Sequence, residues 1–249
     1  MAWYAVLRQL VLLSLLAMPV AAYADLKSDM VKFDQAYIPA LVLSGQGNPL
    51  SALAMDSLLN RWDWFKQRQA YRPDRDTQWN FDLATIERAI LTAKRRVDEG
   101  AYAEAHVTLK GVRISFMHMR QRIGMAYLPD ALTDFHQSLE AMLELMVEGA
   151  DAADVDALRL NYQRASAHWE AALDWPVNPF DYGLNSSEGD LLRRQMLDES
   201  SLLKRLGQQL AAGDHTAMGS TVTEIKDCFI RVYSHFGRFP QPPQTTAAH

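Results

Sequence analysis

The sequence has 249 residues, of which 49% are hydrophobic, and its 25 basic and 30 acidic side chains give a formal net charge of −5. A moderately acidic chain without a basic run does not favour nucleic acid or an anionic membrane surface as a partner. The single cysteine, Cys228, excludes an internal disulfide, so a large packed core must hold the fold.

Residues 1–24 have the pattern of a secretory signal peptide. Arg8 precedes an apolar stretch over 10–20, and residues 22–24 form an A-x-A cleavage motif. The apolar stretch is too short for a membrane span, and no later stretch has 18 uninterrupted apolar residues. Cleavage before Asp25 leaves 225 residues with a net charge of −6, and predicts a periplasmic protein without a membrane span.

The rest of the chain is predicted to be all-α. Apolar residues recur every three or four positions almost throughout, and no stretch alternates with period two. The expected helices of the first half cover about residues 26–44, 49–69, 81–98 and 102–119. Asn48 followed by Pro49 is a start signal for the second of these helices, and Gly100 is a stop signal for the third.

The pattern of the first half then restarts. The segment KFDQAYIPALVL aligns with DFHQSLEAMLEL, which pairs Phe33 with Phe135. Further along, EGAYAEAHVTLKGVRISFMHM aligns with AGDHTAMGSTVTEIKDCFIRV when Gly100 is set on Gly213. The offset grows from 102 to 113 residues, so the second copy is about ten residues longer, and we interpret the sequence as an internal duplication.

Each copy has the length and the short connections of an up-down-up-down four-helix bundle. We therefore expect one bundle over 25–124, a second over 128–237 and a Pro-rich tail over 238–249. The two units pack either as separate bundles or as one merged bundle, and the sequence leaves both arrangements open.

Two segments resemble the soluble periplasmic cytochromes b562 and the related cytochromes c′. They are ADLKSDM, which contains Met30, and FDLATIERAILTAKRRVDEGAYAEAHVTLKGVR. Those families are secreted four-helix bundles with an E-G-x-x-x-E-A hairpin, which Glu99-Gly100 and Glu104-Ala105 fit. The resemblance implies electron-transfer ancestry, a periplasmic redox partner and a bound haem b. Met30 is then one iron ligand, and a histidine late in the fourth helix is the other.

The sequence departs from that family at the histidine. Counted from Gly100, the histidine position falls on Arg120, and His118 lies two residues earlier, which is a rotation of about 200° on a helix. Leu109 and Phe116 mark the apolar stripe of this helix, so His118 is expected to point out of its own bundle. A covalent c-type haem is excluded because CFIRVYSHF has one cysteine where C-x-x-C-H needs two.

A metal ion is the other cofactor that the sequence suggests. His118 and His136 lie nine residues before and after Tyr127, so a helical hairpin centred there brings the two imidazoles together. Glu140 shares a helix face with His136 at i, i+4. Two imidazoles and a carboxylate suit Zn, Cu or Fe. The alternative is that His118 is solvated and His136 is a polar residue at a helix edge.

Two function hypotheses follow. The first is a non-enzymatic haem-binding or metal-binding protein of electron-transfer ancestry. The second is a helical bundle without a cofactor that binds another periplasmic protein or stabilises an envelope assembly. An enzyme is not expected, because no nucleophile elbow, phosphate loop or paired carboxylates are recognisable.

Overall fold

The computed structural model describes residues 25–72, 75–148 and 152–241, and within them the protein is helical without strands, which confirms the all-α class. The predicted signal peptide lies outside the described residues. The first helix covers 25–45. It is followed by α2 (Ser51–Gln69), α3 (Thr77–Asp98), α4 (Tyr102–Arg122), α5 (Leu128–Glu148), α6 (Ala152–Leu173), the 3-10 helix η1 (Pro179–Tyr182), α7 (Ser186–Ala212) and α8 (His215–Ser234). Among the described residues, no helix is long and apolar enough to cross a bilayer.

Local capping decides where the helices begin and end. α3 starts at Thr77 and not near residue 81, because the Asp76 side chain accepts a hydrogen bond of 2.7 Å from the backbone N–H of Trp79. Gly100 ends the α3 segment with φ of 76°, and Gly213 ends α7 with φ of 68°. Both glycines adopt the left-handed conformation that terminates a helix with little strain.

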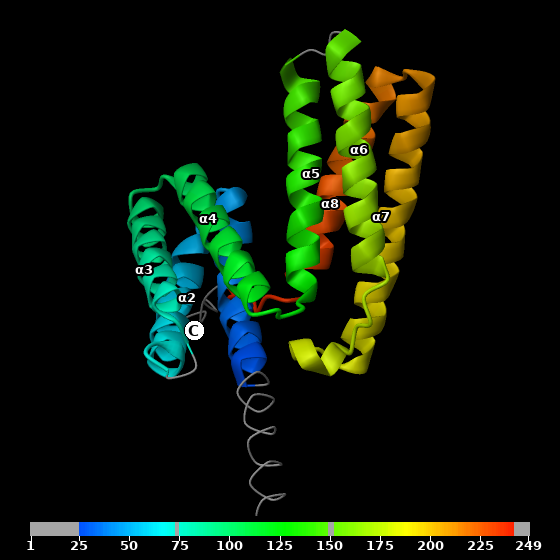
Figure 1. Ribbon diagram of the computed structural model, residues 1–249. Helices are drawn as coiled ribbons and strands as arrows, with labels where there is room; N and C mark the ends of the chain where they lie inside the picture. Colours follow the sequence, from blue (N-terminus) through cyan, green and yellow to red (C-terminus); the bar gives the residue numbers. More distant parts are fainter. Residues whose placement is uncertain (1–24, 73–74, 149–151, 242–249) are drawn as a thin grey trace, which may run out of the picture.

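The helices lie in two groups (Figure 1). The 25–45 helix, α2, α3 and α4 form the first group, and α5 to α8 form the second. Neighbouring helices in each group pack along one another, above all α3 with α4, α5 with α6 and α7 with α8. The chain passes from one group to the other through the short connection between α4 and α5.

Aromatic rings fill the centre of each group. The first group holds a cluster with centroids 4.6–6.4 Å apart, formed by Phe33, Trp62, Phe65 and Phe116. The second group holds rings 4.8–5.6 Å apart, from Phe135, Trp169 and Phe229. Each such buried side chain contributes roughly 1.5–3 kcal/mol to folding, so these clusters are a large part of both cores.

A buried polar network fixes the connection between α4 and α5. Arg120 is only 2% exposed, and its Nε donates to Asp130 at 2.8 Å. The Cζ atom of Arg120 lies over the Tyr127 ring, 4.7 Å from its centroid, and the Tyr127 hydroxyl donates to Asp34 of the first helix at 2.7 Å. Burial raises the pKa of Asp34 to about 6, although Arg120 and Tyr127 oppose this rise. The first helix, α4 and α5 are thereby tied together.

The end of the described chain returns to the first helix. The backbone N–H of Arg238 donates to the carbonyl of Gln35 at 2.7 Å, and Lys27 pairs with Asp181 at 2.7 Å. The first part of the predicted tail, residues 238–241, is not helical, and the rest of the tail lies outside the described residues. Two separate contacts therefore join the second group to the first helix.

Candidate functional site

The surroundings of Met30 do not fit a haem. Met30 is fully buried, and its Sδ atom lies 3.5 Å from Nη1 of Arg120, the residue at the family's histidine position. That arginine is held by Asp130 and offers no lone pair to iron. In the core of the same group of helices, the rings of Phe33 and Phe116 pack with centroids 4.6 Å apart. We therefore derive no redox step from this position.

The structure brings only two of the three predicted metal ligands together. His136 Nε2 lies 3.2 Å from Glu140 Oε1, whereas His118 is exposed on α4. Burial raises the pKa of Asp134, and the charges of His168 and His118 oppose this rise. Among the described residues, no group of three or more His, Cys, Asp or Glu side chains is arranged to hold a metal ion.

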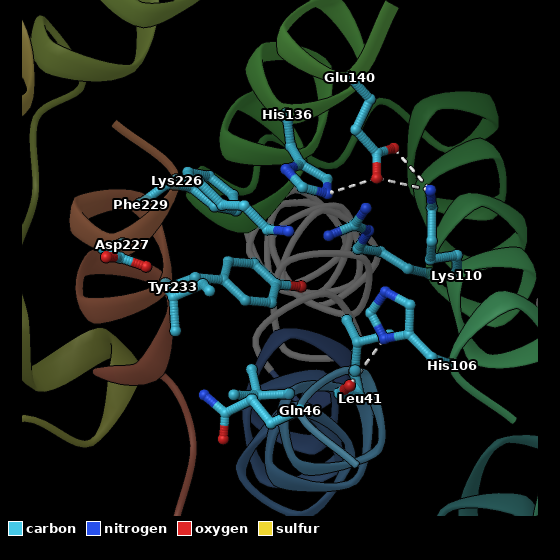
Figure 2. A pocket seen from close by; sticks show the side chains of 14 residues that line it. Leu41, Gln46, His106, Lys110, His136, Glu140, Lys226, Asp227, Phe229 and Tyr233 are labelled. Atoms are coloured by element: carbon cyan, nitrogen blue, oxygen red, sulfur yellow. Dashed lines mark hydrogen bonds and ion pairs between the residues drawn. The ribbon is translucent and has the colours of Figure 1, made fainter. Parts of the chain in front are cut away.

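A pocket of about 330 Å³ lies where the two groups of helices meet. Its walls come from the end of the 25–45 helix, from α4, from α5 and from α8 (Figure 2). The side chains of His106, His136, Lys226 and Tyr233 point toward a common space, and Asp227 on α8 also lines the pocket. Both groups of helices are therefore needed to form this pocket, which we call the junction pocket.

Glu140 is a carboxylate of the junction pocket whose oxygens already have partners. Lys110 Nζ lies 2.6 and 2.7 Å from its two oxygens, and His136 Nε2 lies on the same side. Although burial opposes its ionisation, the hydrogen bonds and charges of His136 and Lys110 hold the pKa of Glu140 at about 2. Burial lowers the pKa of His136, whose ring stacks on Phe229 with centroids 4.8 Å apart. Glu140 is therefore ionised and already paired.

His106 closes another side of the pocket through a tight contact with the first helix. Its Nδ1 atom lies 2.9 Å from the carbonyl oxygen of Leu41, so the neutral ring must carry its proton on Nδ1. Burial lowers the pKa of His106 and favours this neutral form. A Cβ atom at Gly45 would lie 2.8 Å from the same nitrogen. A glycine at this position therefore allows the close approach of the imidazole.

Arg113 is the unusual charge in the junction pocket. It is 5% exposed, its Nε has no hydrogen-bond partner, and no ion pair joins it to a carboxylate within the described part of the chain. Its Cζ lies 5.6 Å from the centre of the Tyr233 ring. Burial disfavours the charged form, but Tyr233 and Tyr37 raise the pKa of Arg113 above its ordinary value. A hydrogen bond with Tyr233 and the charge of Glu140 also favour the charged form, but Arg113 forms no direct ion pair, and burying a guanidinium in this way is costly.

Lys226 supplies a second positive charge to the same space. It is exposed on α8, it lines the junction pocket, and it forms no ion pair with any residue that the structure describes. Three cations, Lys110, Arg113 and Lys226, and two carboxylates, Glu140 and Asp227, line the pocket, and Lys110 is bound to Glu140. The pocket therefore offers two cations, Arg113 and Lys226, to a negatively charged group.

The sequence analysis identified His136 and Glu140 but missed Arg113 and Lys226. Their signal was present in the repeat alignment, which sets these two cations on each other, 113 residues apart, beside the buried apolar stripes. In the structure both cations line the junction pocket.

Comparisons with protein-family models, with characterised proteins and with solved structures found no match to this chain. The resemblance to the cytochromes b562 therefore stays a prediction, and function is argued from the geometry of the junction pocket.

Proposed function

We propose that the protein is a non-enzymatic binding protein that holds a small oxyanion in the junction pocket, between two four-helix bundles that are copies of one unit. The observation that carries the proposal is Arg113, which is buried and charged and has no carboxylate partner within the described residues. An oxyanion beside Arg113 and Lys226 gains charge-assisted hydrogen bonds and offsets the cost of burying the guanidinium.

The positions of buried residues support the duplication. Six core residues of α3 have buried counterparts 113 positions later in α7. In α3 these residues are Trp79, Leu83, Ile86, Ile90, Ala93 and Val97. In α7 they are Leu192, Met196, Glu199, Leu203, Leu206 and Leu210. The shared register agrees with the alignment of the two halves that sets Gly100 on Gly213.

The other residues that line the junction pocket also suit the binding of an oxyanion. The walls of the junction pocket hold hydrogen-bond donors and cations, and the His136–Glu140 pair positions Lys110 at its edge. The predicted haem is not part of this proposal, because the residues around Met30 do not fit it. The signal-peptide pattern of residues 1–24 supports export to the periplasm.

Thermal unfolding with added oxyanions tests the proposal. The chain from Asp25 onward is titrated with inorganic phosphate, acetate and benzoate at constant ionic strength. At a concentration of about 100 times Kd, a bound ligand stabilises the folded state by about 2.7 kcal/mol. For a protein of this size, that corresponds to a rise in Tm of about 5–10 °C. At least one of the three oxyanions is expected to produce such a rise.

Arg113→Gln separates this explanation from general salt effects. The variant is expected to be more stable than the natural chain without ligand, because a buried charge is removed, and to show no rise in Tm with any oxyanion. Arg205→Gln is the matched control, since Arg205 pairs with Glu224 on the surface of α7 and α8, and it is expected to keep the rise. Absence of any rise in the natural chain, or an undiminished rise in Arg113→Gln, contradicts the proposal.

A further inference from the structure

We infer that the ligand of the junction pocket is a monocarboxylate with an apolar body about the size of an aromatic ring. This inference rests on the proposed function and narrows it, because it distinguishes a bare oxyanion from an organic acid. The shape, the apolar wall and the charges of the junction pocket each support it.

The junction pocket is larger than a bare oxyanion. Its volume of about 330 Å³ is the space of roughly eleven water molecules at about 30 Å³ each. Acetate or phosphate has four or five non-hydrogen atoms and leaves most of this space to water. A volume of this size lies at the lower end of the range for small-molecule sites, about 300–1,000 Å³.

Part of the pocket wall is apolar. Leu41 and Val42 of the first helix and Phe229 and Ile230 of α8 line the same pocket as Arg113. Val42 and Ile230 are only partly buried, so a ligand can cover them further. An apolar ligand removes these side chains from water, which is favourable, whereas water in the pocket leaves them hydrated. The wall therefore favours a ligand with an apolar part.

The charges of the junction pocket favour one negative charge over two. Lys110 is committed to Glu140, so Arg113 and Lys226 are the cations that remain. The ionised carboxylate of Glu140 lines the same pocket and repels a second negative charge. A carboxylate is therefore favoured over a phosphate dianion.

Calorimetric titration with acetate, benzoate and inorganic phosphate tests this inference. In the natural chain, benzoate is expected to bind at least tenfold more tightly than acetate or phosphate. Ile230→Ser shortens the apolar wall at a partly buried position and is expected to weaken benzoate binding at least threefold without changing acetate binding. Ile114→Ser on α4 makes the same substitution at a partly buried position that does not line the pocket, and is expected to change neither.

The outcomes separate this inference from the proposed function. Equal affinity for acetate and benzoate, or tighter binding of phosphate, overturns the monocarboxylate inference. If Arg113→Gln abolishes the binding of these oxyanions in that case, the oxyanion proposal stands. Weakening of benzoate by Ile114→Ser as strong as by Ile230→Ser also overturns the inference. Failure of all three oxyanions to bind the natural chain overturns both.

Discussion

Replacing Glu199 with glutamine is expected to remove a pH dependence from the stability of the protein. Glu199 lies in α7 with 0% exposure, and the Cys228 thiol, a weak donor, lies beside its carboxyl group. In the proposed duplication its counterpart is Ile86, so an ionisable group stands at a position of the core that is apolar in the other unit. Burial raises the pKa of Glu199 from 4.5 to about 8.

The size of the effect follows from these two pKa values. Below pH 4.5 the carboxyl group of Glu199 is protonated in both the folded and the unfolded chain, so it adds no pH dependence. Between pH 4.5 and about 8 the folded chain keeps a proton that the unfolded chain releases, and the free energy of unfolding falls as pH rises. At about 1.4 kcal/mol for each pH unit, the loss is about 3 kcal/mol at pH 7 and about 5 kcal/mol above pH 8.

Urea unfolding at pH 5, 6, 7 and 8, followed by circular dichroism, measures this loss. The glutamine of Glu199→Gln cannot ionise, so the stability of this variant relative to the natural chain is expected to increase steadily over this pH range. Glu170→Gln, at an exposed position of α6, is the control and is expected to show the same pH dependence of stability as the natural chain. The raised pKa of Asp34 acts in the same direction below pH 6, but it is common to all three proteins and cancels in the difference. Parallel curves for the natural chain and Glu199→Gln would refute the reasoning.

Two further substitutions test other parts of the structure. Gly45→Ala is expected to displace His106 and to lower the free energy of unfolding by about 1–3 kcal/mol. Gly111→Ala, at a position with open space on α4, is expected to raise the free energy of unfolding by up to about 1 kcal/mol. Urea unfolding measures both changes, and equal effects of the two substitutions would contradict the contact between Gly45 and His106. Arg120→Met leaves Asp130 buried without its partner and is expected to cost about 3–5 kcal/mol in the same assay, and a change below 1 kcal/mol would contradict the network.

The helices could be predicted from the sequence because each buries one apolar stripe at helical spacing. The buried residues Leu83, Ile86 and Ile90 of α3 follow that spacing, and so does Phe116 of α4. The start of α3 could not be predicted as well, because it depends on a hydrogen bond from the Asp76 side chain in a polar segment without periodicity.

The candidate site was only partly predictable for a different reason. His136 and Glu140 share one helix face, so their contact follows from local geometry. The presence of Arg113 and Lys226 in one pocket depends on how two groups of helices pack against each other, and no short-range pattern encodes that arrangement. The metal site predicted from the sequence also joined the two halves, through His118, His136 and Glu140, but His118 lies exposed on α4 and does not line the pocket.

The position of the junction pocket has an evolutionary consequence if the two units are copies of one ancestor. A single unit has no such pocket, since its walls come from helices on both sides of the α4–α5 connection. Gene duplication thus creates a new surface of contact whose residues are free to change without disturbing either aromatic core. Substitutions at positions such as Arg113 and Lys226 then alter what the protein binds, while the two folds that support them stay the same.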